Sequence, residues 1–277
     1  MLIKFDKMQS LGNDFIMIDL DQFSKRPFFD DFFFPNISNR NYGVGCDLTV
    51  LYKLRRDNIY AEFFNSDGSE AEICGNAARC LGALMKKRNG LSKCTLKTTK
   101  KNYPISENGV ICINMGQPSF KLEDIGASKS IASSSALMDE LSLPANTGIY
   151  HAACISVGNP HLVLFCEDLP EEKEIIILGN LLGNHSLFKN RINVSFACVI
   201  SESEIVTTIY ERGVGLTRAC GSGACAVAAI AFAHNIVSST NVLVKQKGGT
   251  LTIYCDNEGN IFQSGPAFWV FWGEIEI

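Results

Sequence analysis

The chain reads YERGVGLTRACGSGAC over Tyr210–Cys225, and this stretch leads into an alanine-rich apolar segment. The same plan occurs upstream as FNSDGSEAEICGNAAR over Phe64–Arg79. Both stretches pass from a strand-like entry through a glycine-containing turn to Cys-Gly and a small-residue segment typical of a helix. A constant offset of 146 residues superimposes three pairs of positions: Asn65 on Glu211, Cys74 on Cys220 and Gly75 on Gly221. The repeat predicts one cysteine at one helix start in each half of the chain.

A helix start suits a reactive cysteine for electrostatic reasons. The first backbone N–H groups have no partner within the helix and the dipole is positive there, so the pKa of a thiol is expected to fall. The same groups can hold an anion, and a glycine after the sulfur allows close approach. Two such helix starts facing each other would hold one carboxylate and set a thiol on each side of the adjacent carbon. This arrangement suits moving a proton from one face of that carbon to the other.

Packing alone is the alternative interpretation of these cysteines. The chain has 11 of them, and cysteine commonly behaves as a small buried hydrophobe. Five lie in β-like apolar runs and are interpreted as core residues: Cys112, Cys154, Cys166, Cys198 and Cys255. Cys80 and Cys225 lie inside the two helices and are expected to pack. For Cys74 and Cys220 the repeated context favours chemistry.

Composition excludes several classes of function. A net charge of −4 with 19% charged residues provides no basic face for nucleic acid and no polybasic membrane patch. The longest apolar run, 224–233, is too short to span a bilayer. The N-terminus lacks the apolar core of a signal peptide, and the odd number of cysteines includes no C-x-x-C pair. We therefore expect a cytoplasmic protein with reduced thiols.

The pattern of strands and helices predicts an α+β fold. One helix is expected from Cys74 to about Arg88, because basic residues and Gly90 follow it as stop signals. A second, from about Gly221 to His234, is apolar around nearly its whole circumference and must be enclosed. We predict two similar lobes from internal duplication, each a curled, mostly antiparallel sheet wrapped around a central helix, with the active site in the cleft between them. The segment 121–145 is expected to be a variable surface excursion.

The paired motifs around Cys74 and Cys220 resemble those of the diaminopimelate epimerases, a family of cofactor-free amino-acid epimerases. The resemblance extends along the whole chain, in the family's order: GNDF at 12–15, GVGCD at 43–47, MGQP at 115–118, VGNPH at 157–161, NV at 193–194, GGTL at 248–251 and GPA at 265–267. Each snippet alone is weak, whereas the set is highly specific. By this resemblance the C-terminal strand returns to the first lobe. The expected domains are therefore 1–117, completed by about 264–277, and 118–263.

The resemblance implies epimerisation of L,L-diaminopimelate to the meso form, in lysine and peptidoglycan biosynthesis, with no cofactor and no metal. One of Cys74 and Cys220 would act as thiolate base and the other as thiol acid. The expected partner is a small amino-acid substrate, with no nucleic acid and no membrane, and a homodimer is left open. A metal site is also disfavoured by the residues, because His161 has no second histidine near it in sequence.

The resemblance also assigns roles to the other matched residues. Glu211 would bind the α-ammonium and, with His161, assist the cysteines, while Arg212 would hold the distal carboxylate. The α-carboxylate would lie on the backbone after the cysteines, and four amides would recognise the distal end. The first set is Gly75, Asn76, Gly221 and Ser222, and the second is Asn13, Asn65, Asn159 and Asn193. From the residues alone, a turn or capping role for each asparagine and for His161 is the alternative.

Four positions depart from the family's usual pattern. Leu48 replaces Gly or Gln, Ala77 replaces Gly, Leu216 replaces a common Glu, and Ser222 replaces Thr. Leu48 and Leu216 could loosen substrate recognition, so a broader racemase acting on glutamate or aspartate is the second hypothesis. Proline racemases and phenazine-type isomerases would share the architecture but fit the motifs less well. A non-enzymatic, redox-sensing dithiol protein is the third hypothesis.

Overall fold

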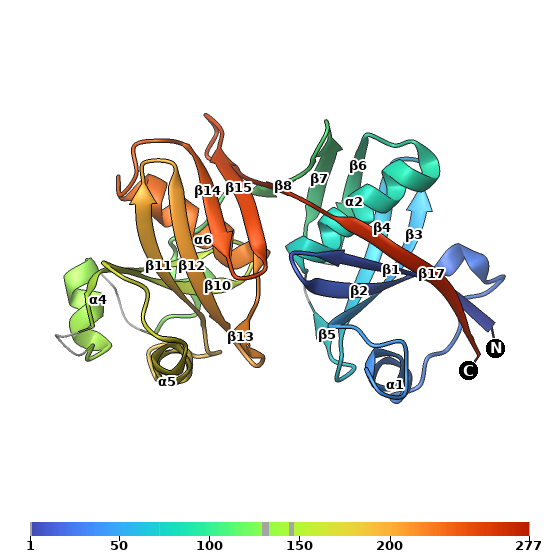
Figure 1. Ribbon diagram of the computed structural model, residues 1–277, viewed down its shortest axis with the longest axis horizontal. Helices are drawn as coiled ribbons and strands as arrows, with labels where there is room; N and C mark the ends of the chain where they lie inside the picture. Colours follow the sequence, from blue (N-terminus) through green and yellow to red (C-terminus); the bar gives the residue numbers. More distant parts are fainter. Residues whose placement is uncertain (1, 72, 129–132, 144–146, 277) are drawn as a thin grey trace. The chain divides into compact units, whose positions relative to one another are not determined.

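The chain forms two compact units. The computed structural model describes residues 2–71, 73–128, 133–143 and 147–276. Unit 1 comprises Met1–Asn114 and Ser264–Ile277, and unit 2 comprises Met115–Gln263. The architecture is mixed α/β, dominated by strands with few helices, in agreement with the expected fold class at this level (Figure 1). None of the helices within the described ranges has the length and hydropathy needed to cross a membrane.

Unit 1 is built mainly from strands around one long helix. Its elements are β1 (Leu2–Ser10), β2 (Asn13–Asp19), η1 (Leu20–Gln22), α1 (Phe33–Ser38), β3 (Leu48–Arg55), β4 (Asn58–Asn65), β5 (Glu70–Ala71), α2 (Gly75–Asn89), β6 (Lys93–Lys97), β7 (Asn102–Glu107), β8 (Ile111–Gly116) and β17 (Phe268–Glu276). The C-terminal strand β17 pairs antiparallel with β1 over its whole length, so the two ends of the chain lie in one unit. Strand β8 and strand β16 each span the division between the units.

The strands of unit 1 alternate between antiparallel and parallel neighbours. The pairs β1–β2, β3–β4 and β6–β7 are antiparallel, and β2–β3 and β4–β6 are parallel. Helix α2 packs against β1, β2, β6, β7 and β17. It ends as its sequence predicts: the last turn carries Lys86, Lys87 and Arg88, and Gly90 adopts the left-handed conformation with φ 69°. The predicted helix over Cys74–Arg88 is confirmed to within one residue.

Unit 2 repeats the order of strand pairings found in unit 1 and has additional helices. Its elements are α3 (Leu122–Ile125), α4 (Ser134–Glu140), β9 (Ile149–Ser156), β10 (Pro160–Cys166), α5 (Glu172–Gly183), β11 (Asn193–Ser201), β12 (Glu204–Glu211), β13 (Gly215–Thr217), α6 (Gly221–Ala233), β14 (Asn241–Gln246), β15 (Gly249–Cys255) and β16 (Ile261–Gly265). The pairs β9–β10, β11–β12 and β14–β15 are antiparallel, and β10–β11 and β12–β14 are parallel. These senses match those of the corresponding strands in unit 1.

Helix α6 is enclosed by the strands of unit 2. It contacts β9, β10, β11, β12, β14 and β15, and residues 223–231 are all buried. Alanine fills most of these positions, which lets the strands approach closely. At Gly223 an added Cβ would collide with the Ile209 side chain of β12. The enclosure predicted from the missing polar face is therefore confirmed.

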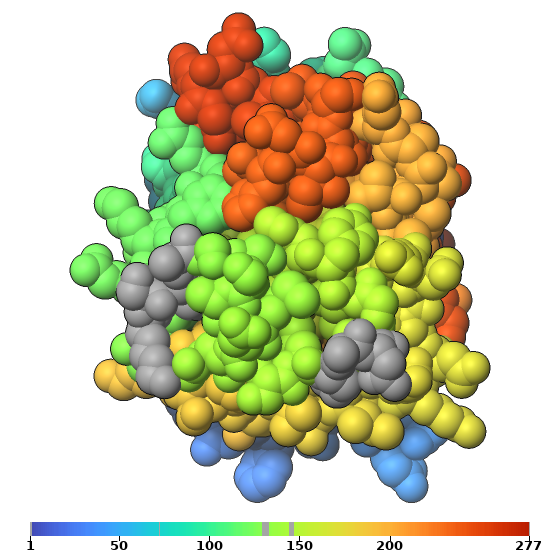
Figure 2. Space-filling model, turned by 90° about the vertical axis from the view of Figure 1, so that its left-hand side faces the viewer, coloured from blue at the N-terminus to red at the C-terminus, as the bar shows by residue number. Residues whose placement is uncertain are grey.

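The segment 121–145 does more than form a surface excursion. Ile125 of α3, and Leu137 and Leu141 at α4, are at most 3% exposed and belong to the core cluster of unit 2. Helix α4 packs against β9 and lies at the surface in the space-filling view, in the green to yellow-green region (Figure 2). The other described residues of the segment are exposed or half-exposed, as expected of a surface excursion, but three apolar residues anchor its short helices in the core. Residues 129–132 and 144–146 of this segment lie outside the described part of the chain.

Candidate active site

Cys74 caps the start of α2 in unit 1. Its backbone is extended, with φ −120° and ψ 115°, and the helix begins at Gly75. The side chain is half-buried, and its thiol donates to Asn13 Oδ1 at 3.5 Å. It forms no capping hydrogen bond with its own helix. The sulfur therefore leaves the first N–H groups of α2 to other acceptors.

Two amide side chains lie beside Cys74, and a third predicted amide, Asn65, forms a hydrogen bond in its own turn. Asn76, only 1% exposed, has its Nδ2 at 3.5 Å from Asn13 Oδ1. Asn65, at the end of β4, instead donates through Nδ2 to Ser69 Oγ at 2.9 Å within its own turn. The structure thus brings Asn13 and Asn76 to the first cysteine, whereas the role of Asn65 in substrate binding stays a prediction.

Cys220 occupies the matching position at the start of α6 in unit 2. Its backbone angles, φ −125° and ψ 116°, nearly equal those of Cys74. Its Sγ accepts a hydrogen bond from the Gly223 N–H at 3.4 Å and lies 3.4 Å from Ser222 Oγ. The backbone N–H of Cys220 donates to Gln246 Oε1 at 2.7 Å. Nothing in the sequence pattern of β14 marks Gln246 as part of this site.

Burial reverses the expected effect of the helix start on Cys220. The side chain is 6% exposed. Burial raises the pKa of the Cys220 thiol well above its usual value, and the nearby charge of Glu211 raises it further. The Ser222 hydroxyl and the Gly223 N–H act in the opposite direction but are weaker. The prediction of a lowered pKa was therefore wrong for Cys220, because the loss of hydration outweighs the helix terminus.

Glu211 reaches Cys220 because the β12–β13 hairpin folds back before α6. Glu211 is paired with Gly215 across this hairpin, and its Oε1 accepts a hydrogen bond from Thr217 Oγ1 at 2.6 Å. The charge of the Glu211 carboxylate acts on the Cys220 thiol. A carboxylate held against a buried thiol can accept its proton when the local charge changes.

His161 is fully buried on β10 and touches the same helix start. Its Nε2 lies 3.1 Å from Asn159 Oδ1 and 3.2 Å from Ser222 Oγ. Asn159 Nδ2 donates to Ser222 Oγ at 3.3 Å. Burial, with a contribution from the charge of Arg212, lowers the pKa of His161 to about 3. The lowered pKa keeps the ring neutral at physiological pH, and within the described residues its Nδ1 has no hydrogen-bond partner.

Asn193 is used inside unit 2 to hold two backbone segments. It is 4% exposed, and its Nδ2 donates to the Pro160 carbonyl at 2.9 Å. Its Oδ1 accepts from the backbone N–H of Arg212 at 2.9 Å. Asn193 therefore fixes the start of β10 relative to the turn that carries Arg212.

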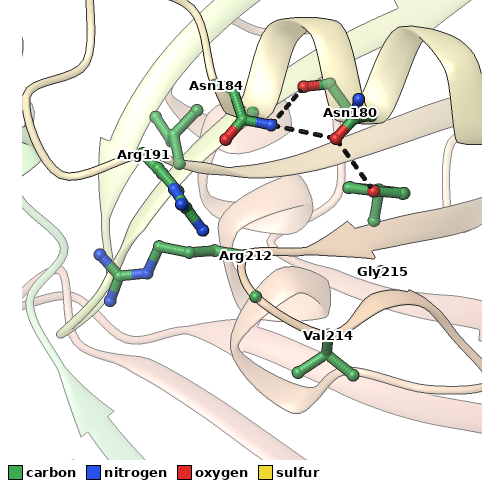
Figure 3. A pocket seen from close by; sticks show the side chains of 10 residues that line it. Asn180, Asn184, Arg191, Arg212, Val214 and Gly215 are labelled. Carbon is green, nitrogen blue, oxygen red and sulfur yellow. Dashed lines mark hydrogen bonds between the residues drawn. The ribbon is translucent and has the colours of Figure 1, made fainter.

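Arg212 lines a pocket of about 220 Å³ between α5 and the β12–β13 turn (Figure 3). Its Nη1 donates to the Asn190 carbonyl at 3.1 Å. In Figure 3 the side chain of Arg191 reaches the same end of the pocket, while Asn180 and Asn184 lie along the helix. Two guanidinium groups at one pocket suit a carboxylate ligand. Arg191 was not predicted, because a basic residue in a polar loop has no distinguishing sequence signal.

The described residues contain no group of three or more His, Cys, Asp or Glu side chains that could hold a metal ion. The predicted site residues instead form two clusters. In unit 1 they are Asn13, Cys74, Gly75 and Asn76, and in unit 2 they are Asn159, His161, Glu211, Cys220, Gly221 and Ser222. Asn193 accepts a hydrogen bond from the backbone of Arg212, and it lies opposite His161 of the second cluster in the β10–β11 pair.

Comparison with known proteins gives a consistent result. The family model described as diaminopimelate epimerase matches residues 5–121 and 153–270. A diaminopimelate epimerase from Gluconobacter oxydans is 36% identical over 277 residues, covering 99% of both chains. One from Methanococcus maripaludis is 35% identical over 286 residues, covering 99% of this chain and 100% of the relative.

Solved structures share the fold at much lower sequence identity. A phenazine biosynthesis protein of the PhzF family from Bacillus anthracis matches with a TM-score of 0.69 and 17% identity, covering 100% of both chains. A hydroxyproline epimerase from Agrobacterium vitis matches with a TM-score of 0.68 and 11% identity, covering 99% of this chain and 92% of the other. At these identities the likeness supports the fold alone.

The buried His161 predicts a specific acid sensitivity. The pKa of this histidine is depressed in the folded state, so the unfolded chain binds one more proton below about pH 6.5. Its contribution to stability is complete above that pH and is lost as the pH falls toward 3, at up to about 1.4 kcal/mol per pH unit. His161→Gln should therefore show a shallower loss of unfolding free energy between pH 6.5 and 4.5, measured by urea denaturation. Equal slopes of unfolding free energy against pH in the two proteins would contradict the depressed pKa. Measurements at pH 8 give the difference in stability that the substitution causes when the histidine is neutral in both the folded and the unfolded state.

Proposed function

Because the chain belongs to the diaminopimelate epimerase family, we propose that its two cysteine-capped helix starts are the acid and base of one epimerisation site. The protein is an isomerase of the epimerase class. One observation carries the proposal. Cys74 and Cys220 have nearly the same N-cap conformation, and each lies at the corresponding position in the repeated order of strands and helices. Such a pair of thiols needs no cofactor to exchange a proton at carbon.

The repeated strand order supports an internal duplication. Five corresponding strand pairings have the same senses in the two units, and in both units a helix begins directly after the cysteine. We infer two lobes of common origin, with the substrate held in a cleft between their helix starts. The proposal requires both sulfurs to reach one α-carbon from opposite faces.

In the proposed reaction, the thiolate of one cysteine removes the α-proton. The C–H bond breaks, the proton passes to that sulfur, and the electron pair spreads into the α-carboxylate. The thiol of the other cysteine then gives its proton to the opposite face of the carbon, becoming a thiolate. The carboxylate lies on the N–H groups after Cys74 and Cys220, at Gly75, Asn76, Gly221 and Ser222. The positive ends of both helices stabilise the charge as it develops.

The buried acid–base groups supply the thiolate that the reaction needs. The Glu211 carboxylate acts on the Cys220 thiol through its charge, so Glu211 would take that proton and bind the α-ammonium of the substrate. His161 is neutral and contacts Ser222 beside Cys220. A neutral imidazole can accept a proton, and we propose that it assists the cysteines in this way.

The distal end of the substrate is assigned to the Arg212 pocket. Arg212 would bind the distal carboxylate through two parallel hydrogen bonds, and the pocket has room for a small polar group. Asn159 and Asn193 hold the neighbouring backbone and hydroxyl groups. The overall product is meso-diaminopimelate, and we propose that it serves lysine and peptidoglycan synthesis in the cytoplasm.

The two-base mechanism predicts opposite half-reactions in two variants. A diaminopimelate analogue with a leaving group on the β-carbon needs only one proton abstraction before it eliminates. Cys74→Ala and Cys220→Ala should each eliminate one stereoisomer and fail with its mirror partner, in opposite senses, and both should lose epimerisation. Chromatography of the elimination products measures this. The mechanism is wrong if both variants process the same isomer, or if either keeps near-normal epimerisation.

The assignment of Arg212 predicts an effect on substrate binding. Arg212→Lys keeps the positive charge but removes the planar guanidinium that can form two parallel hydrogen bonds with a carboxylate. The KM for diaminopimelate should therefore rise about tenfold, with a smaller change in kcat. Arg218→Lys, at an exposed position in the same unit, is the matched control and should behave as the parent protein. If the unmodified protein racemises glutamate and leaves diaminopimelate unchanged, the broader-specificity hypothesis replaces this one.

A further inference from the structure

A cluster of four charged side chains surrounds the start of β2 in unit 1. The Arg40 guanidinium donates to both carboxylate oxygens of Asp14, at 3.0 and 2.7 Å, and to Asp47 Oδ1 at 2.6 Å. Lys7 donates to Asp14 Oδ2 at 2.6 Å and to the Gly45 carbonyl. Burial disfavours the charge on Asp14, but the hydrogen bonds from Arg40 and Lys7 outweigh it and hold the pKa of Asp14 far below its usual value. Asp14 therefore stays ionised between its two cationic partners.

The second oxygen of Asp47 determines how the Asn13 amide is turned. Asp47 Oδ2 accepts hydrogen bonds from Asn13 Nδ2 at 2.9 Å and from the Asp14 backbone N–H at 3.0 Å. An ionised carboxylate can only accept hydrogen bonds. Asn13 must therefore direct its nitrogen to Asp47 and its oxygen to the other side.

A buried arginine imposes the complementary orientation from α2. Arg79 is fully buried, and its Nη2 donates to Asn76 Oδ1 at 2.5 Å and to Ser10 Oγ at 2.7 Å. A guanidinium can only donate hydrogen bonds. Asn76 must therefore direct its oxygen to Arg79 and its nitrogen to Asn13.

The two orientations meet at one atom. Asn13 Oδ1 lies 3.5 Å from Asn76 Nδ2 and 3.5 Å from Cys74 Sγ. Hydrogen-bond donation therefore runs in one direction, from Arg79 through Asn76 and Asn13 to Asp47. Charged groups at both ends hold the two amides in these orientations, so Asn13 presents its amide oxygen to Cys74.

We propose that Asp47 is a positioning residue, which holds the Asn13 amide oxygen against Cys74 and so keeps that cysteine as a thiol before substrate binds. An amide oxygen accepts a hydrogen bond from a thiol and repels a thiolate, whereas an amide N–H would stabilise the thiolate. The inference assigns a protonation state to Cys74, one of the two cysteines of the proposed two-base mechanism, and therefore rests on the proposed function. Asp47 acts through Asn13 and does not itself contact the sulfur in the described contacts.

The test measures the reactivity of Cys74 in the full-length protein. Trypsin releases Asp57–Arg79, which contains Cys74 and no other cysteine, so mass spectrometry can follow its alkylation by iodoacetamide against pH. In Asp47→Asn the Asn13 amide can turn its N–H to the sulfur. The midpoint of the alkylation profile should then move to lower pH by about half a unit or more, the effect of one hydrogen bond that changes from opposing to favouring the thiolate.

A double-mutant cycle separates positioning from charge. Asp47→Asn also removes a negative charge, which alone favours a thiolate. The same substitution is therefore made in an Asn13→Ala background, where the amide is absent. The shift should be clearly larger with Asn13 present than without it. Equal shifts in both backgrounds, or no shift in either, overturn the proposal.

Two further variants complete the design. Asp21→Asn removes an aspartate that forms a two-point ion pair with Arg55, at 2.5 and 2.8 Å, and should leave the Cys74 profile unchanged; an equal shift there also overturns the proposal. If Asp47→Asn does not fold, Asp47→Ser carries the same expectation, because its hydroxyl can still accept the Asp14 N–H. The readout is thiol reactivity, so it stays decisive even if diaminopimelate is not the substrate.

Discussion

The first turn of an α-helix carries backbone N–H groups that find no carbonyl partner inside the helix. In both units of this protein a cysteine with an extended backbone stands at that point, and a glycine follows it. The strand before each helix, the hairpin or turn, and the enclosing sheet hold that cysteine in place. The position of each cysteine at a helix N-terminus links the fold to the proposed reaction, because it places a sulfur next to backbone N–H groups that can bind a carboxylate.

The surroundings of the two helix starts oppose early ionisation of the thiols. Burial and Glu211 raise the pKa of Cys220, and the amide oxygen of Asn13 faces Cys74. In the proposed resting state both thiols are protonated, and a protonated thiol is protected from oxidation and alkylation. The cationic ammonium of the substrate would offset the charge of Glu211, and this change would favour the thiolate only when a substrate is present.

Sequence patterns predicted the parts of this structure that local chemistry determines. Basic residues and Gly90 end α2 where they were expected to, and the missing polar face of α6 correctly indicated its enclosure. Effects that depend on contacts between residues far apart in sequence could not be predicted from local patterns. The burial that raises the pKa of Cys220 depends on strands distant in sequence, and Asp47 meets Asn13 across 34 positions only because β2 and β3 are parallel neighbours. Asn65 matches a motif and also forms a hydrogen bond in its own turn, and residue type alone cannot separate the two roles.

The central claim is that one thiol takes a proton from the α-carbon and a different thiol returns one to the opposite face. Epimerisation of L,L-diaminopimelate in D₂O, followed by mass spectrometry of substrate and product at low conversion, tests it most directly. The account predicts deuterium at the inverted α-carbon of the meso product and protium in the unreacted substrate, because the returning thiol has exchanged with solvent. Product that retains the substrate's own proton, or substrate that gains deuterium as fast as product forms, would contradict it.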